Sequence, residues 1–148
     1  MATTEGAPIA DRHGHEESPG EPGPADPEDP RRRRGPPTAD QVRDELARDI
    51  LRIHEESYGK GAQTPTAIVE GDWVIVILDG LELLPNERFL IENGKSDVVT
   101  RVRTQYQLAI QSSFRAAVER ATGRRVVGFA SATSVDEPRF AAEIFKLA

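Results

Sequence analysis

Apolar residues recur at helical spacing just after the first quarter of the chain. Between residues 39 and 57 the apolar positions lie mostly three or four apart, at Val42, Leu46, Ala47, Ile50, Leu51 and Ile53. Thr38 and Gln41 form a capping-box pair ahead of this stretch, and Gly59 follows it. Because such a pair satisfies free backbone groups and glycine readily ends a helix, the pattern predicts a helix from Ala39 to about Ser57.

A second amphipathic stretch covers residues 96–122. Its apolar positions form one broad stripe: Val98, Val99, Val102, Tyr106, Ala109, Ile110, Phe114, Ala117, Val118 and Ala121. Ser96 is a suitable cap and Gly123 a suitable stop. A helix of this length measures about 40 Å, so we expect part of it to extend beyond the sheet. A short helix is also predicted over Leu84 to Glu92, where Pro85 suits the first turn.

Strand patterns lie between and after these helices. The runs 66–70 and 73–79 are separated by Gly71, which predicts a hairpin. The second run is apolar on both alternating faces, as expected for a central strand that is buried on both sides. Residues 125–133 predict a further strand, with Gly128 at a bulge or a close approach. Residues 142–147 fit either a helix or a strand, and we favour a strand because three strands alone would leave a thin sheet with an unpaired edge.

The predicted order is therefore α-β-β-α-β-β, preceded by a tail. This is an α+β fold in which a small, mostly antiparallel sheet carries its two main helices on one face. Two helices can cover only one face, although the run from Trp73 to Leu78 is apolar on both. A second copy of the chain is the simplest cover for the other face, so we predict a homodimer.

Composition divides the chain into a tail, residues 1–37, and one domain, residues 38–148. The tail holds eight of the 11 prolines, and Ile9 is its only large aliphatic residue after Met1. Such a segment cannot bury enough apolar surface to offset the entropy of ordering it, so we expect it to be disordered. The whole chain carries a formal charge of −6, and both parts are acidic.

Several classes of protein are disfavoured by composition. The longest apolar run, residues 73–78, is far shorter than the roughly 18 residues that cross a bilayer, so we predict no direct membrane insertion. The first 30 residues lack a basic start followed by an apolar stretch, and the chain has no cysteine. We therefore expect no secretory signal, no disulfide framework and no thiolate metal site. A cytoplasmic location is the simplest expectation.

The tail contains two groups of residues that could bind a ligand, a run of arginines and a pair of histidines. A run of four arginines could contact nucleic acid or an anionic membrane surface: Arg31, Arg32, Arg33 and Arg34. A solvated charge block, balanced by the preceding acidic residues, is the simpler interpretation. His13 and His15 lack the further ligands that a defined metal site needs.

Within the domain, the loop Tyr58-Gly59-Lys60-Gly61 places a cation between two flexible residues. Its amides could cradle an anion, and the loop could contact a partner. It does not match a Walker loop, and an ordinary helix-ending loop is the alternative. His54 invites an acid–base interpretation beside two glutamates, although a histidine near the end of a helix is a common structural choice.

The remaining polar groups give weaker signals. Arginines between residues 101 and 125 form no single stripe, with Arg103 and Arg120 at the borders of the apolar face, which favours a solvated helix surface. Asp136 and Glu137 are weak evidence for a cation site. The sequence contains no Ser-His-Asp set, no dinucleotide fingerprint and no closed metal site. We therefore predict no catalytic residue, no metal and no cofactor, and a protein that is not an enzyme.

A family resemblance is carried by motifs in a fixed order. They are His54-Glu55-Glu56-Ser57-Tyr58-Gly59-Lys60-Gly61, then Glu70-Gly71, Leu78-Asp79-Gly80 and Thr122-Gly123-Arg124-Arg125-Val126-Val127-Gly128-Phe129. In this order they resemble the MpsC family, which is named for a sodium-translocating, membrane-potential-generating system. The resemblance covers about residues 40–148. Lys60 and Ala62 depart from the Arg and Pro of the family loop, and Leu84-Pro85 departs from its Thr-Pro.

The resemblance implies a small cytosolic component of a cation-dependent membrane system, without established catalytic residues. Because a chain that lacks a membrane-spanning helix cannot move an ion across a bilayer, we predict an accessory or regulatory protein that docks on membrane-transport subunits. Its dimer surface or the Tyr58 to Pro65 loop would make the contact. The alternative is a nucleic-acid-associated protein that uses Arg31 to Arg34, which the acidic domain makes less favourable. An enzyme acting on small molecules would need a polar pocket, and the sequence indicates none.

Overall fold

The computed structural model describes residues 35–148, and Pro36–Ala148 form one compact unit. The arginine run, the histidine pair and most of the predicted disordered tail lie outside the described residues. The described part contains α1 (Ala39–Tyr58), β1 (Ala62–Glu70), β2 (Trp73–Leu81), α2 (Pro85–Glu92), α3 (Ser96–Thr122), β3 (Val126–Ser134) and β4 (Phe140–Leu147). This order confirms the α+β class, with the predicted short helix as α2.

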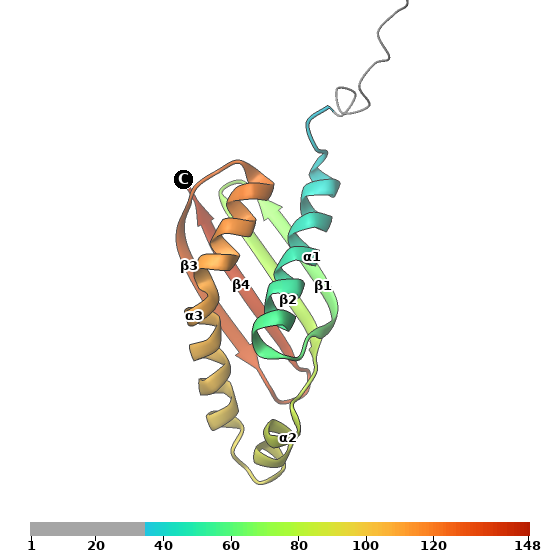
Figure 1. Ribbon diagram of the computed structural model, residues 1–148, viewed down its shortest axis with the longest axis vertical. Helices are drawn as coiled ribbons and strands as arrows, with labels where there is room; N and C mark the ends of the chain where they lie inside the picture. Colours follow the sequence, from blue (N-terminus) through green and yellow to red (C-terminus); the bar gives the residue numbers. More distant parts are fainter. Residues whose placement is uncertain (1–34) are drawn as a thin grey trace, which may run out of the picture. The chain divides into compact units, whose positions relative to one another are not determined.

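The four strands form one antiparallel sheet in the order β1-β2-β4-β3. α1 and α3 lie side by side on one face of this sheet, and α2 lies beyond its end (Figure 1). The prediction that β2 is a central strand is confirmed. The C-terminal segment, for which a helix was the alternative, is a strand and occupies the second central position.

The two ends of α1 follow the sequence signals. The Thr38 hydroxyl accepts a hydrogen bond from the Gln41 backbone N–H (3.2 Å), and the Gln41 side chain accepts one from the Thr38 N–H (2.9 Å). Gly59 ends the helix in the left-handed region, with φ at 85°. Glycine reaches that region without a steric penalty, so the capping box and the glycine together define the length of α1.

Two boundaries differ from the prediction. β1 begins at Ala62, so residues 62–65 belong to a strand and not to a loop. Pro65 is tolerated there because β1 is an edge strand, in which a missing N–H need not break the ladder. Ser96 does not cap α3: Lys95 occupies the cap position, and the Ser96 hydroxyl donates to Asp136 Oδ1 at 2.7 Å. The predicted irregularity at Gly128 is confirmed as a shift in the β3–β4 register.

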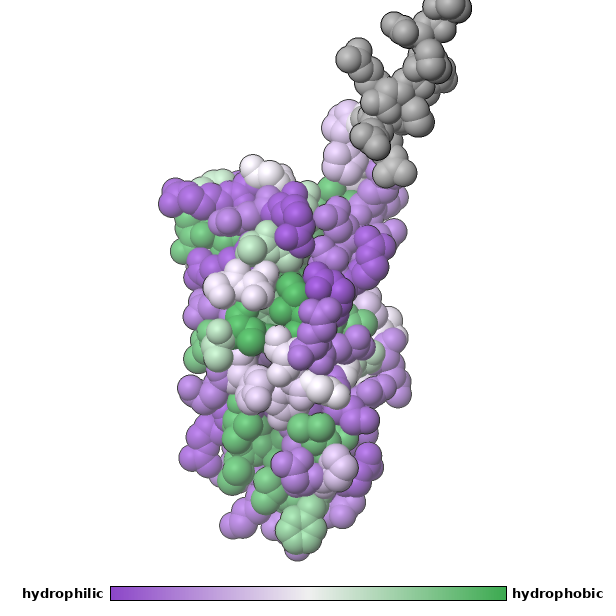
Figure 2. Space-filling model, viewed as in Figure 1, coloured by the Kyte–Doolittle hydropathy of each residue, from purple (hydrophilic) through white to green (hydrophobic). Residues whose placement is uncertain are grey.

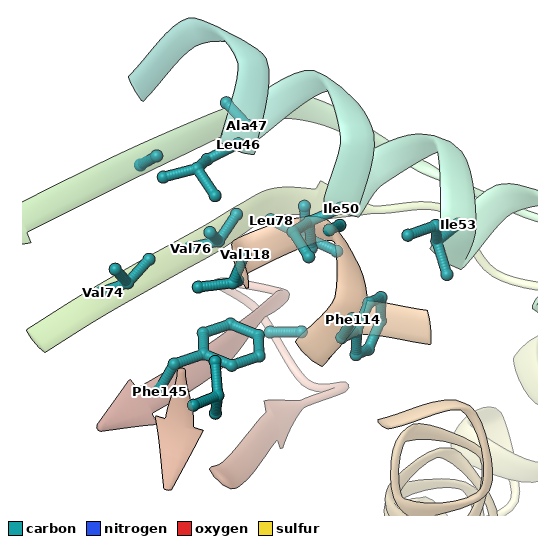
Figure 3. Close-up of a cluster of buried hydrophobic side chains, with 14 of the residues drawn as sticks. Leu46, Ala47, Ile50, Ile53, Val74, Val76, Leu78, Phe114, Val118 and Phe145 are labelled. Carbon is teal, nitrogen blue, oxygen red and sulfur yellow. The ribbon is translucent and has the colours of Figure 1, made fainter. Parts of the chain in front are cut away.

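The apolar core lies between the helices and the sheet (Figure 3). α1, β2, α3 and β4 all contribute side chains that are completely or almost completely buried: Leu46, Ile50, Val74, Val76, Leu78, Phe114, Val118 and Phe145. Each large aliphatic or aromatic side chain contributes roughly 1.5–3 kcal/mol by leaving water. These contacts hold α1 and α3 on the sheet.

The face that α3 presents to the core differs from the predicted stripe. Its buried residues are Val99, Arg103, Gln107, Phe114, Ala117 and Val118. Val102 and Tyr106 are exposed instead, which corrects their assignment to the core. The predicted stripe was too wide for one contact line, because successive turns at 3.6 residues bring only one line of positions toward the sheet.

The face of the sheet that points away from α1 and α3 is the outer face, and its centre is apolar. Val74, Val76 and Leu78 of β2 are buried under the helices, whereas the alternate residues Ile75 and Ile77 are only half-buried. Trp73, on the same side as Ile75, is 48% exposed. Within residues 35–148 no element covers this face, so the expected burial of β2 on both sides is not achieved by one chain. The homodimer stays a prediction.

Candidate functional site

A buried ion pair lies where α2 meets α3. Arg103 Nε donates to Glu87 Oε1 and Nη2 to Glu87 Oε2, each at 2.8 Å, and Nη2 also donates to the Glu82 carbonyl at 2.8 Å. Arg103 is 1% exposed and Glu87 is 4% exposed. This bidentate pair is the strongest form of a charge-assisted hydrogen bond. It corrects the expectation that Arg103 belongs to a solvated helix surface.

The Glu87 carboxylate receives further hydrogen bonds from two other segments. The Tyr58 hydroxyl at the end of α1 donates to Oε1, and the Leu84 N–H donates to Oε2 at 2.8 Å. The Arg103 guanidinium carbon also lies 4.5 Å from the centre of the Tyr58 ring, a favourable cation–π distance. Burial raises the pKa of Glu87, but the bonds from Arg103, Tyr58 and Leu84 outweigh it, so the pKa lies below its usual value. The carboxylate is therefore ionised at neutral pH.

His54 lies one turn before Tyr58 on α1 and faces the same cluster. The two rings are 5.8 Å apart, and His54 is almost completely buried. Burial, and then the charge of Arg103, lower the pKa of His54 to about 4, although a hydrogen bond with the Lys60 backbone opposes this. A neutral, enclosed imidazole offers a substrate no access. We call the set Tyr58, His54, Glu87 and Arg103 the polar cluster.

The Tyr58–Gly61 loop closes around this cluster. Tyr58 points inward to Glu87, and the Gly61 carbonyl accepts a hydrogen bond from the Glu82 N–H at 3.0 Å. A Cβ atom at Gly61 would lie 2.2 Å from Glu55 Oε1, so only glycine fits without moving that side chain. Gly59 and Gly61 are therefore both explained by the backbone geometry of the loop. Lys60, between them, is half-buried. A role of the loop in binding an anion or a partner stays a prediction.

An open groove of about 630 Å³ runs along the first half of α3. We call it the α3 groove, and its lining is mainly apolar: Val98, Arg101, Val102, Gln105, Tyr106, Ala109 and Ile110. Apolar surface gathers over the part of the helical layer formed by α2 and the first half of α3 (Figure 2). The Tyr106 ring meets the Tyr58 ring edge to face at 4.9 Å. The groove therefore adjoins the polar cluster.

Most cations of the α3 region pair with nearby acceptors. Arg101 contacts Asp97 at 3.2 Å and Arg120 contacts Asp49 at 3.1 Å, both on the surface. Arg124 contacts Asp72 Oδ1 at 2.6 Å and also donates to the carbonyl of Ala148. These contacts leave little unbalanced positive charge for a polyanion along this helix.

The acidic turn that was a weak cation candidate is engaged in local contacts. Asp136 accepts the hydrogen bond from Ser96, and Glu137 pairs with Arg139 at 2.7 Å. In the described part of the chain, no three His, Cys, Asp or Glu side chains come together to hold a metal ion. The helices of residues 35–148 also include none that is long and apolar enough to cross a membrane.

Sequence reasoning missed two buried acids. Glu87 stands at the third position of α2, where a glutamate reaches back to the first free N–H, so the Pro85-Asn86-Glu87 order is a detectable signal. Glu143 lies on the inner face of β4, and only strand parity could have located it. Burial raises the pKa of Glu143 to about 7, and the Ser131 hydroxyl opposite offsets only part of this rise.

The described part of the chain is thus a small α+β domain with a closed polar cluster and two uncovered apolar surfaces, the outer face and the α3 groove. A family model described as "Na+-translocating membrane potential-generating system (MpsC)" matches residues 38–148. The chain belongs to the MpsC family, which confirms the resemblance of its ordered motifs. No curated protein and no solved structure matches the chain.

Proposed function

We propose that this protein is a non-enzymatic accessory subunit of a sodium-dependent, membrane-potential-generating system. It would act from the cytoplasmic side by binding a membrane-embedded subunit. The observation that carries the proposal is the α3 groove: an apolar surface that residues 35–148 leave uncovered, in a chain whose family is named for such a system. Exposed apolar surface of this kind commonly marks a protein interaction site.

The chemistry of the groove favours an apolar helical segment as its partner. Val102 and Tyr106 are both close to half exposed and stand one turn apart on α3. A helix that laid its own apolar stripe along this line would cover both side chains at once. Tyr106 also contacts Tyr58, so an occupant of the groove would lie beside the Tyr58–Gly61 loop that the sequence suggested as a contact region.

The polar cluster supports a structural role and not a catalytic one. Its carboxylate is saturated by Arg103, Tyr58 and the Leu84 N–H, and its histidine is enclosed. A general base or nucleophile must reach a substrate, whereas these groups reach one another. We therefore assign the cluster to holding α2 and the groove in place.

The test uses membrane vesicles from cells in which the gene for this chain has been deleted. The sodium-dependent part of the membrane potential is measured with a voltage-sensitive dye, in NaCl against KCl and with a protonophore present. We expect deletion to lower this part and added full-length chain to restore it in proportion, with saturation at a fixed ratio to the membrane subunits. Restoration by trace amounts would indicate an enzyme and contradict the proposal.

Groove variants identify the contact. Val102→Lys places a charge in the centre of the groove and should abolish restoration, while circular dichroism shows an intact fold. Arg88→Ser changes the charge of the neighbouring helix α2 outside the groove and is the matched control. An unchanged membrane potential after gene deletion would overturn the proposed function. Full restoration by Val102→Lys would overturn the groove as the contact.

A further inference from the structure

The outer face of the sheet has a regular arrangement of side chains. The strand registers align four rows of residues across β1, β2, β4 and β3. In that strand order the rows are Glu70-Trp73-Lys146-Gly128, Ile68-Ile75-Ile144-Ala130, Thr66-Ile77-Ala142-Ala132 and Thr64-Asp79-Phe140-Ser134. The two middle rows contain no charged residue, and the charges stand only in the outer rows. An apolar centre with a polar border is the usual plan of a protein interface.

Side-chain size divides the same surface lengthwise. β3 contributes mainly small residues to it, namely Gly128, Ala130, Ala132 and Ser134, and the exposed Val127 stands at the register shift beside Gly128. The opposite half, formed by β1 and β2, carries the large side chains Ile68, Trp73, Ile75 and Ile77. The β1–β2 side is therefore raised and the β3 edge is low, with Ile144 and Phe140 of β4 between them, so the surface can fit a rotated copy of itself.

We propose that two copies of this chain pack outer face to outer face, about a two-fold axis that lies in the interface and runs along the strands. This rotation places β1 over β3 of the partner and β2 over β4 of the partner. Ile68 then meets the small side chain of Ala130, and Ile75 meets Ile144. Facing large residues with small ones fills the space between two sheets, which lie about 10 Å apart. An axis across the strands would instead stack β3 on β3 and leave a gap between small residues.

The available area is sufficient for a dimer of modest stability. Four strands about 4.8 Å apart and four rows about 6.8 Å apart give roughly 500 Å² of flat surface on each copy. Two copies would bury about 1,000 Å², which is the lower end for a specific interface. We therefore expect a dissociation constant in the micromolar range, so that the dimer forms as the concentration rises and dissociates on dilution.

Other occupants fit this face less well. Residues 1–37 contain one large aliphatic residue besides Met1, too few to cover the two middle rows. The face carries the carboxylates of Glu70 and Asp79 against one ammonium group, Lys146, so an anionic membrane or a nucleic acid would be repelled. Pairing at the sheet edges is also disfavoured, because Pro65 removes a donor from β1 and a register shift interrupts β3.

Solution mass gives the first test, on the full chain over about 1–200 μM. We expect the mass to rise from 16.3 kDa toward twice that value. Trp73 is the only tryptophan and lies on this face, so its emission should shift to shorter wavelength over the same range.

Ile144→Lys should weaken association by about 100-fold, because it buries two unpaired charges. Val102→Lys, in the α3 groove, should leave association unchanged. A chain that stays monomeric at 200 μM, or a dimer lost with Val102→Lys but kept with Ile144→Lys, would overturn the proposal.

Cross-linking tests the direction of the axis. The chain has no cysteine, so Ile68→Cys and Ala130→Cys each introduce a single thiol. With a bismaleimide of about 10 Å span, matched to the sheet separation, the mixture of both variants should form a covalent dimer. Each variant alone should not, because β1 and β3 lie at opposite edges of the sheet. Cross-linking of either variant alone, with none added by mixing, would contradict an axis along the strands.

Discussion

The two ends of the helical layer are held by opposite kinds of interaction. At the end near the β1–β2 hairpin, α1 and α3 meet the sheet through apolar side chains such as Leu46, Val118 and Phe145. At the other end, next to α2, the contacts are those of the polar cluster, centred on Glu87 and Arg103. The first end gains stability from area removed from water. At the second end the interactions determine orientation, because a bidentate pair fixes α2 against α3 in one arrangement.

The difference predicts different responses to mutation. An apolar contact can be reduced in small steps, and each step has a cost that depends on the cavity it leaves. A buried ion pair cannot, because removal of one partner leaves the other buried and uncompensated. Removal of both partners can cost less than removal of either one. Five predictions examine how the fold responds to such changes, from the largest expected effect to the smallest.

Phe114→Ala should be the most destabilising change at the apolar end. The ring is completely buried, and its centre lies 6.2 Å from that of the tilted Phe129 ring. We expect a loss of about 4 kcal/mol in the free energy of unfolding, measured by urea denaturation. Phe89→Ala is the matched control, because Phe89 is 65% exposed and its loss should stay within about 0.5 kcal/mol. Equal losses for the two variants would contradict the location of the core.

Glu87→Ala should destabilise the polar end by roughly 3 kcal/mol, because it leaves the Arg103 guanidinium buried without its carboxylate. The double variant Glu87→Leu with Arg103→Met should recover much of this loss. A double-mutant cycle in urea measures the coupling between the two residues. If the two single losses simply add, the pair does not act as a unit and the contrast with the apolar end fails.

Glu143→Gln should stabilise the protein at alkaline pH. The folded pKa of Glu143, about 7, lies above the ordinary value of 4.5, so wild-type stability falls as pH rises from 4.5 through 7. A difference of this size corresponds to about 3 kcal/mol at pH 8 and less than about 1 kcal/mol at pH 5. Glutamine carries no charge and escapes this cost. Urea titrations of both proteins at pH 5 and pH 8 measure it, and an equal gain at both values would contradict ionisation as the cause.

His54→Gln should make the protein more stable as the pH falls from 7 to 5. The folded pKa of His54, about 4, lies below the ordinary 6.5, so its contribution is complete above pH 6.5 and is lost as pH falls toward 4. This loss amounts to about 2 kcal/mol between pH 7 and pH 5. Over the same interval the contribution of Glu143 to the free energy of unfolding rises by a similar amount. The two changes cancel, so the stability of the wild type should change little. The His54 variant should become more stable on acidification and the Glu143 variant less stable; identical slopes would refute both assignments.

The sequence predicted the apolar end of the helical layer better than the polar end. Apolar periodicity, the capping box and the glycine at 59 located the helices and three of the strands, because each depends on neighbours in the chain. In the polar cluster Arg103 contacts Glu87, 16 positions away, and Tyr58, 45 positions away, and no local rule brings these residues together. Arg103 in particular lies at the border of the predicted apolar stripe, and from that position its partner on α2 could not be inferred. The exposure of Tyr106 was missed for the same reason, since it depends on what α3 packs against.

The start of α1, at the apolar end, provides the smallest and most local test. Thr38→Ala removes the hydroxyl that accepts the Gln41 N–H and should cost about 1 kcal/mol, because one backbone donor loses its partner. Thr38→Ser should retain most of that stability. Ser96→Ala should cost less, since Ser96 does not cap α3 and its hydroxyl meets only the exposed Asp136. Thermal unfolding of the three variants gives the order directly. A larger loss for Ser96→Ala than for Thr38→Ala would mean that contact with the β3–β4 turn, and not helix capping, contributes the greater stability.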